Sequence, residues 1–287
     1  MADDASYELL AVDLDGTLLD SQHAVPSRSR DALHAAHESG LKIVLCTGRS
    51  FTETRPILEQ IGLDFDATVT VGGALLTEVA TGRTIDSTPI DLDTARQAAD
   101  WLLSRGHTVL WLCDASELGF DGHLLDTGQR HAAIRYWLKV TPCRMEAHSG
   151  LPADCRAPLR LTAVDDIHVL DRVSREFERQ FDGCLTSNVI RVPNYGFTVL
   201  EAFDSAVNKW YGIEKLCRRW RIDPRRTVAV GDDVNDVAML HHAGLGVAVA
   251  NAKPAAKKAA RRVVASNDEC GVADLVAELL EAGKSDA

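Results

Sequence analysis

The chain has 287 residues, of which 46% are hydrophobic and 25% are charged. This composition is typical of a globular protein and excludes disordered and low-complexity chains. The formal net charge is −11, which argues against nucleic acid as the main partner because phosphate contacts need a basic face. The length favours two domains.

The chain shows no sign of membrane insertion or secretion. No run approaches the roughly 18 apolar residues that a membrane span needs, and the first residues lack the order of a signal peptide. The seven cysteines include no Cys-x-x-Cys pair, so neither a disulfide framework nor a thiolate zinc site is expected. We therefore expect a cytoplasmic protein without a membrane partner.

Both ends of the chain contain short, continuous apolar runs that alternate with helical patterns. The runs predict strands at 9–12, 43–46, 68–71, 228–230 and 246–249, with a weaker one at 263–264. The helical patterns lie at 28–39, 50–61, 208–220 and 233–243. Continuous runs are typical of strands covered on both faces, so the ends predict a parallel α/β sheet.

The middle of the chain, residues 88–203, has a different pattern and predicts an inserted α+β unit. Its expected elements are helices at 93–105 and 168–181 and strands at 108–113, 158–164 and within 186–202. The segments 114–130 and 141–157 lack periodicity and are expected to be loops. The predicted domains are 1–87 together with 204–287, and the insertion 88–203.

Two acids, Asp13 and Asp15, follow the first predicted strand. Strand alternation predicts that both point to one side, where two carboxylates repel unless a cation or a proton intervenes. The pair favours Mg²⁺, although the acids could simply end the strand and cap the following turn. An EF-hand is excluded, because the loop position that requires glycine holds Leu18.

Polar clusters also follow two other predicted strands. In an open parallel sheet the site lies beyond the carboxyl ends of the strands, so clusters far apart in sequence can share one crevice. Each cluster alone is unspecific, since a threonine and a glycine after a strand are often only a helix cap. The residues expected to converge are Asp13, Asp15, Thr47, Asp232, Asn235 and Asp236.

Four ordered segments together resemble the haloacid dehalogenase (HAD) superfamily, and specifically its Cof-type (subclass IIB) phosphatases. The segments are 13–17 (DLDGT), 47–49 (TGR), Lys209 and 231–236 (GDDVND). Ala206 and Trp210 depart from the glycines that relatives commonly carry around the lysine. The resemblance implies a Rossmann-like parallel-sheet core, an inserted α+β cap that selects the substrate, and Mg²⁺-dependent phosphatase activity.

The resemblance also implies a role for each residue. Asp13 would be the nucleophile that forms an aspartyl-phosphate, and Asp15 the general acid and base. The implied Mg²⁺ ligands are Asp13, Asp15 (through its backbone carbonyl) and Asp232. The implied phosphate-binding residues are Leu14, Thr47, Gly48, Lys209 and Asn235, with Asp236 orienting Lys209 or a metal-bound water.

The expected substrates are small phosphorylated metabolites such as sugar phosphates. The polar or aromatic residues of the insertion that could face such a substrate are Trp111, Asp114, His123, Arg130 and Arg160. A phosphomutase that shields the same aspartyl-phosphate from water is one alternative. A non-catalytic regulator that binds a phosphorylated ligand is another, although such a protein has no need of a nucleophile.

Overall fold

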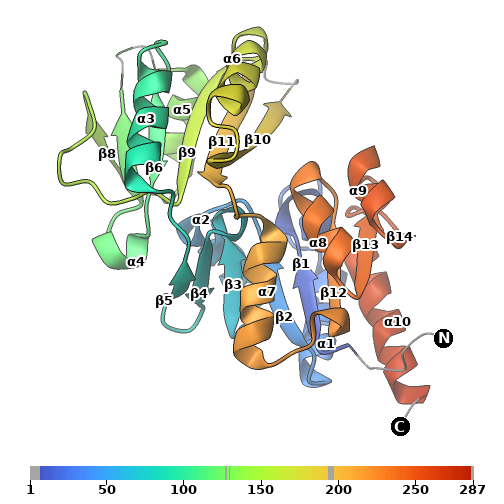
Figure 1. Ribbon diagram of the computed structural model, residues 1–287. Helices are drawn as coiled ribbons and strands as arrows, with labels where there is room; N and C mark the ends of the chain where they lie inside the picture. Colours follow the sequence, from blue (N-terminus) through green and yellow to red (C-terminus); the bar gives the residue numbers. More distant parts are fainter. Residues whose placement is uncertain (1–6, 127, 129, 193–196, 286–287) are drawn as a thin grey trace. The chain divides into compact units, whose positions relative to one another are not determined.

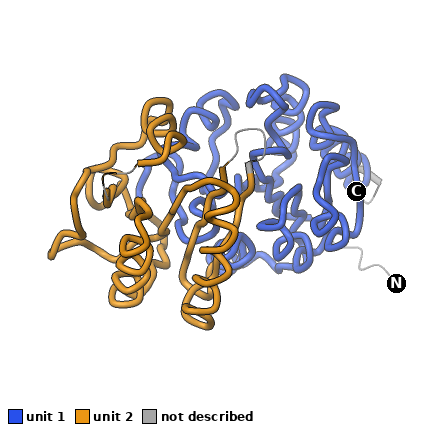
Figure 2. The backbone as a smooth tube through the Cα atoms, turned by 90° about the horizontal axis from the view of Figure 1, so that it is seen from above, with its two compact units in different colours: residues 1–83, 208–287 blue, residues 84–207 orange. Residues whose placement is uncertain are grey.

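The computed structural model describes residues 7–126, 128, 130–192 and 197–285. The chain divides into two compact units, Met1–Arg83 with Asn208–Ala287, and Thr84–Val207 (Figure 2). The two divisions lie four residues from the expected positions, 87/88 and 203/204. Among the described residues, no helix has both the length and the apolar character that crossing a bilayer requires.

A largely parallel sheet forms the centre of the first unit. Its strands follow the order β14 (Arg262–Val264), β13 (Leu245–Val249), β12 (Thr227–Gly231), β1 (Leu9–Val12), β2 (Lys42–Cys46) and β3 (Ala67–Thr70). All neighbouring pairs in this series are parallel, which confirms the six predicted strands and the parallel sheet. The order continues with β4 (Leu75–Glu78), antiparallel to β3, and β5 (Thr84–Ser87), with which the second unit begins.

Helices cover both faces of this sheet (Figure 1). Alternate strand residues, such as Leu10 and Val12, pack in one apolar cluster with α1 (Ser27–Glu38), α2 (Phe51–Ile61) and α10 (Gly271–Ser285). On the other face, α7 (Lys209–Trp220) packs against β3, and α8 (Val237–His242) contacts α7 and β12. A further short helix, α9 (Pro254–Ala259), packs on α8 and β13.

The expected helix 233–243 is wrong at its start. Residues Val234–Asp236 form one 3₁₀ turn, and α8 begins only at Val237. The side chain of Asp236 turns back to accept the backbone N–H of Asp232 and of Asp233, each at 2.9 Å. This local capping bond competes with a regular α-helical turn at that place.

The second unit has a six-stranded sheet with helices on both faces. The strand order is β10 (Leu185–Val192), β11 (Phe197–Asp204), β9 (Arg160–Asp166), β6 (Val109–Leu112), β7 (Gly122–Leu125) and β8 (Met145–His148). All neighbouring pairs are antiparallel except β7 with β8. Helices α3 (Leu92–Leu103) and α6 (Ile167–Gln180) pack on one face, and α5 (Ala132–Val140) packs on the other.

This architecture confirms an α+β unit, but the expectation of loops at 114–130 and 141–157 is wrong. The first segment contains α4 (Ala115–Leu118) and β7, and the second contains β8. Both strands have only four residues, and β8 carries Glu146 and His148. The residues of β7 (GHLL) do not alternate, and the alternation in β8 (MEAH) spans only four residues, so the sequence alone did not mark these segments as strands.

Candidate active site

The ends of three adjacent strands bring together residues that are distant in sequence. In the sheet β1 lies between β12 and β2, and Asp13, Thr47 and Asp232 each follow the last residue of one of these strands. The backbone N–H of Asp13 donates to the carbonyl of Val230 at 3.0 Å, which extends the β1–β12 ladder by one residue. The carboxyl edge of a parallel sheet is where open α/β folds place their sites.

A buried lysine links two carboxylates at this edge. Lys209 Nζ donates to Asp13 Oδ1 at 2.5 Å and to Asp236 Oδ1 at 2.6 Å. The three residues are between 0% and 4% exposed. Lys209 is the first residue of α7, whose preceding residue Asn208 caps the helix by accepting the N–H of Tyr211 at 3.0 Å. Of the two functions expected for Asp236, the geometry places its carboxylate on the lysine.

Backbone bonds hold Asp236 in place. Its Oδ2 accepts the N–H groups of Asp232 and Asp233, so both carboxylate oxygens are used. A Cβ atom at Gly231 would lie 2.5 Å from the Asp236 side chain, so only glycine permits this approach. The sequence GDDVND thus forms a rigid turn around one buried carboxylate.

The electrostatics of the cluster are dominated by burial. Burial raises the pKa of Asp13 well above its ordinary value; Asp236 and Asp232 add to the shift, and Lys209 opposes it. Burial, with the charges of Asp236 and Asp233, raises the pKa of Asp232 to about 6. Burial lowers the pKa of Lys209, but the two carboxylates outweigh this effect and raise it above its ordinary value. The lysine is therefore charged.

The acidic cluster fits a divalent metal ion. One ligand atom from each of Asp13, Asp232 and Asp236 lies within 4.8 Å of the others. Three carboxylates against one ammonium leave two negative charges, which a divalent cation would neutralise. Carboxylate oxygens are also the donors that hard cations prefer.

Asp232 is positioned by the turn that follows β1. The Thr17 hydroxyl donates to Asp232 Oδ1 at 3.2 Å. Gly16 has φ +79°, and a Cβ atom there would lie 2.5 Å from the Asp232 carboxylate. The side chain of Asn251 donates to the Gly16 carbonyl at 2.7 Å. The turn therefore requires glycine at position 16 both for its conformation and for its contact with the acid.

Asp15 does not join the acidic cluster. The expectation that strand alternation places Asp13 and Asp15 on one side is wrong, because β1 ends at Val12 and Leu14–Leu18 form a π-helical turn. The side chain of Asp15 is exposed and accepts two bonds from Arg49, from Nε at 2.8 Å and from Nη2 at 2.5 Å. Burial works against the charge of Arg49, but its bond to Asp15 raises the pKa of the guanidinium above its ordinary value.

The other expected phosphate-binding residues lie at these strand ends and turns. Thr47 is 1% exposed, and its hydroxyl accepts the N–H of Arg49 at 3.1 Å. Gly48 lies between them in the bend that follows β2. Leu14 is fully buried in the turn after β1. Among the described residues, the buried Oδ1 of Asn235 has no hydrogen-bond partner, so it is an acceptor for which the structure supplies no donor.

The expected substrate-facing residues of the second unit mostly have structural partners. Trp111 is fully buried and donates to the Arg156 carbonyl at 2.9 Å. Arg160 is buried in an ion pair with Glu201 at 2.8 Å. Asp114 lines a pocket with Cys113, Cys155 and Arg156, caps α4 through the N–H of Ser116, and accepts from the Thr84 hydroxyl. Arg130 pairs with Asp126.

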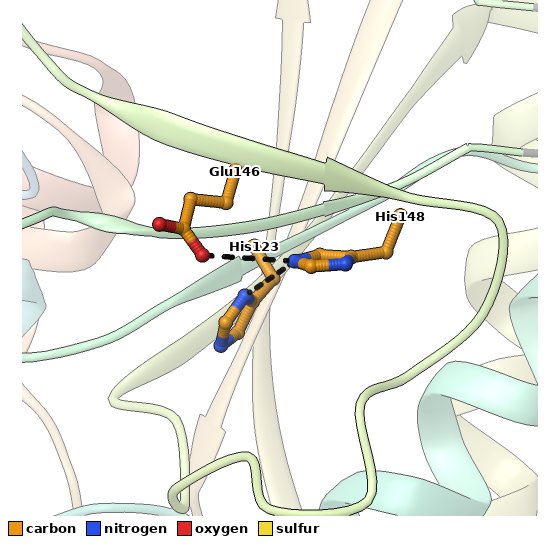
Figure 3. Close-up of side chains that lie close together, drawn as sticks. All are labelled: His123, Glu146 and His148. Carbon is orange, nitrogen blue, oxygen red and sulfur yellow. Dashed lines mark hydrogen bonds and ion pairs between the residues drawn. The ribbon is translucent and has the colours of Figure 1, made fainter.

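Sequence reasoning missed two features of the described residues. The contact of Arg49 with Asp15 was not foreseen, although the arginine stands in a recognised motif. The second is a group of three side chains, His123, Glu146 and His148, in the second unit (Figure 3). The spacing Glu-x-His is the period-two signal that could have revealed the latter, because alternate strand residues share a face.

Comparisons with known proteins agree with the fold. The family of haloacid dehalogenase-like hydrolases matches residues 10–276. The phosphatase YwpJ of Bacillus subtilis is 27% identical over 296 residues, which cover 95% of this chain and 100% of the relative. The pyridoxal phosphate phosphatase YbhA of Escherichia coli is 24% identical over 274 residues, which cover 93% and 97%.

A solved structure has the same fold. The structure of a HAD subclass IIB sugar phosphatase superimposes with a TM-score of 0.76 at 24% identity, covering 94% of this chain and 98% of that one. The family match spans both units, and the relatives align over nearly their whole length. The resemblance indicated by the four motifs is thereby confirmed: the chain belongs to the haloacid dehalogenase-like hydrolases and is a phosphatase of that type.

Proposed function

We propose that this chain hydrolyses small phosphomonoesters in a Mg²⁺-dependent reaction, with Asp13 as the nucleophile. The observation that carries the proposal is the buried triad of Asp13, Lys209 and Asp236 at the carboxyl end of β1. A carboxylate that is 4% exposed and held by a charged lysine is costly to bury. Such an arrangement is expected where chemistry requires it.

In the first step, a carboxylate oxygen of Asp13 forms a bond to phosphorus while the bond from phosphorus to the ester oxygen breaks. Asp15 gives its proton to the departing alkoxide. In the second step, water attacks the same phosphorus, its proton passes to Asp15, and Asp13 is released together with inorganic phosphate. Two displacements at one centre replace a single difficult hydrolysis.

Lys209 serves both steps without titrating. Its ammonium stands against Asp13 and would also attract the phosphoryl oxygens, where negative charge develops. We assign the remaining phosphoryl contacts to Leu14, the Thr47 hydroxyl, Gly48 and the side chain of Asn235, whose Nδ2 group can donate to an anionic oxygen.

Arg49 contacts the side chain of Asp15, the proposed general acid and base. The two bonds from Nε and Nη2 of Arg49 orient the Asp15 side chain, which accepts a proton from water in the second step. The first step needs the protonated form, so one of the two bonds must open before the leaving group departs. We assign to Arg49 the positioning of Asp15 for this exchange.

The metal ligands in this proposal are the carboxylates of Asp13 and Asp232 and the backbone carbonyl of Asp15. When bound, Mg²⁺ would offset the repulsion between the anionic nucleophile and the anionic substrate. Asp236 is assigned to Lys209, because both of its carboxylate oxygens are already used in hydrogen bonds.

The substrate class is proposed from the relatives. One of them is named for pyridoxal phosphate and one for sugar phosphates, and both compounds are small phosphomonoesters. We assign substrate selection to the second unit, as a cap, because it contains a pocket lined by Asp114, Glu117 and Arg156 among others.

The test is phosphate release from a panel of sugar phosphates, nucleotides, pyridoxal phosphate and nitrophenyl phosphate, with and without Mg²⁺. Asp13→Asn is compared with Asp31→Asn, which alters an exposed acid on α1. We expect Mg²⁺-dependent release that Asp13→Asn abolishes and Asp31→Asn preserves. Full release by Asp13→Asn would refute the nucleophile, and phosphate that returns to the substrate pool would instead indicate a mutase.

A further inference from the structure

The second unit contains a group of potential metal ligands that the phosphatase chemistry does not use. His123, Glu146 and His148 each point a ligand atom toward the others (Figure 3). Apart from the acidic cluster, no other such group occurs among residues 7–126, 128, 130–192 and 197–285. We propose that these three side chains form a second metal site, which takes a zinc-like divalent ion.

The parallel pairing of β7 with β8 creates this group. His123 lies opposite Glu146, and Leu125 lies opposite His148. Because alternate residues of a strand share a face, Glu146 and His148 lie on one side, together with His123 across the ladder. The intervening residues face the other way, since Leu124 and Met145 pack in the apolar cluster of α5. The same face of the two strands, which also carries the buried Leu125, thus supplies all three ligands.

The distances fit two imidazole nitrogens on one ion. His123 Nδ1 and His148 Nε2 lie 3.2 Å apart. Two nitrogens bound tetrahedrally to zinc, at about 2.0–2.1 Å each, would be separated by about 3.3–3.4 Å. Glu146 Oε2 lies 3.8 Å from His148 Nε2, and a small side-chain rotation would bring it to the same separation.

The surroundings favour a cation over a simple hydrogen bond between two histidines. Burial and the His148 imidazole have the largest influence on His123, and Glu146 and Asp154 add negative charge close to it. In a neutral histidine pair, one ring N–H donates to the other ring. The Glu146 carboxylate, 3.8 Å from His148 Nε2, is then too far from it for a strong hydrogen bond. A metal ion between the three atoms would use both nitrogens and the carboxylate together.

The ligand types select the ion. Imidazole nitrogens suit zinc and the other late first-row metals, whereas Mg²⁺ prefers oxygen. The acidic cluster of the first unit consists of carboxylates, so the two sites differ in the ion they prefer. The side chains of His148 and Glu146 are 33% and 56% exposed, so the ion can enter and keep a fourth, water-filled position.

The site would also fasten the edge of a sheet. The strand β8 is the last in the order of the second unit and has only four residues. An ion held by both strands would tie β8 to β7 and resist fraying at that edge. We therefore expect zinc to stabilise this unit.

The test is a zinc titration of the full chain in excess Mg²⁺, which occupies the oxygen site. We expect one Zn²⁺ per chain, and Co²⁺ in its place should give the intense visible spectrum of a tetrahedral ion. Glu146→Gln and His148→Ala, both at partly exposed positions, should weaken zinc binding by at least about tenfold. His168→Ala, an exposed histidine on α6 of the same unit, should leave it unchanged.

A second readout separates this site from the phosphatase. Zinc should raise the Tm of the parent and of His168→Ala but not that of His148→Ala. Mg²⁺-dependent phosphate release should be equal in all three, which also shows that the variants are folded. Zinc affinity that is unchanged in both ligand variants, or no zinc bound at micromolar concentration, would overturn the proposal.

Discussion

Replacing Lys209 with methionine removes the one ammonium that stands between Asp13 and Asp236. The side chain is 1% exposed and makes bonds of 2.5 and 2.6 Å to the two carboxylates. Methionine has a similar length and no charge. The substitution therefore keeps most of the side-chain volume but removes the positive charge that balances the two carboxylates. Two buried carboxylates would then face each other without a partner.

The loss can be estimated from this geometry. Removing one partner of a buried ion pair costs about 3–5 kcal/mol, because the remaining charge stays desolvated. Proton uptake by Asp13 would limit the cost at acid pH, since burial and its acidic neighbours already raise the pKa of this carboxyl. For activity, the loss of one preorganised charge at the phosphoryl group predicts a rate reduced by about 10² to 10³.

Urea unfolding and phosphate release measure the two effects on the same preparations. Lys253→Met is the matched control. The Lys253 side chain is 53% exposed, so its ion pair with Asp233 should contribute about 1 kcal/mol or less to the free energy of unfolding. If Lys209→Met were as stable as Lys253→Met, the buried-pair reasoning would be wrong. A rate within tenfold of the parent would likewise remove Lys209 from the proposed chemistry.

Two further predictions follow from the site and its support. Folding raises the pKa of Asp232 from 3.8 to about 6, so the folded chain binds this proton more tightly and the stability of the metal-free protein falls as pH rises across that window. Mg²⁺ binding needs the ionised carboxylate, so Mg²⁺ should raise the Tm more near pH 7.5 than near pH 5. An equal rise at both pH values would contradict this prediction. Gly73 has φ +109°, and a Cβ atom there would lie 2.1 Å from the Asn208 carbonyl, next to Lys209. Gly73→Ala should therefore lower both the free energy of unfolding and the rate of phosphate release. Gly62 has φ +70° and open space around it, so Gly62→Ala should cost only about 1–2 kcal/mol of backbone strain. Equal losses of stability in the two variants would contradict the steric argument.

The core of the first unit was predictable from local sequence. A strand buried on both faces is apolar at nearly every position, so β1, β2 and β12 stand out as almost continuous runs. The polar residues that follow them, including Asp13 and Asp232, mark the carboxyl edge of the sheet. These signals lie within a few residues of one another, which is why they can be recognised without the fold.

The strands β7 and β8 gave no such signal. The strand β8 lies at the edge of the sheet, where exposed polar residues such as Glu146 are tolerated, and β7 beside it is buried but has only four residues. Their pairing depends on hydrogen bonds to strands elsewhere in the unit. The Glu-x-His spacing of β8 indicates a shared face for Glu146 and His148, but their proximity to His123 could not be known before the strand register was known.

The chemistry shows the same division. The sequence by itself determined which residue types are present, in which order, and at the end of which strands. Only the tertiary structure decided that Lys209 bonds Asp13 across 196 residues and that Arg49, rather than Asp13, is the neighbour of Asp15. Contacts between distant segments depend on the packing of α7 on the sheet and on the turn that ends β1, and neither leaves a local pattern.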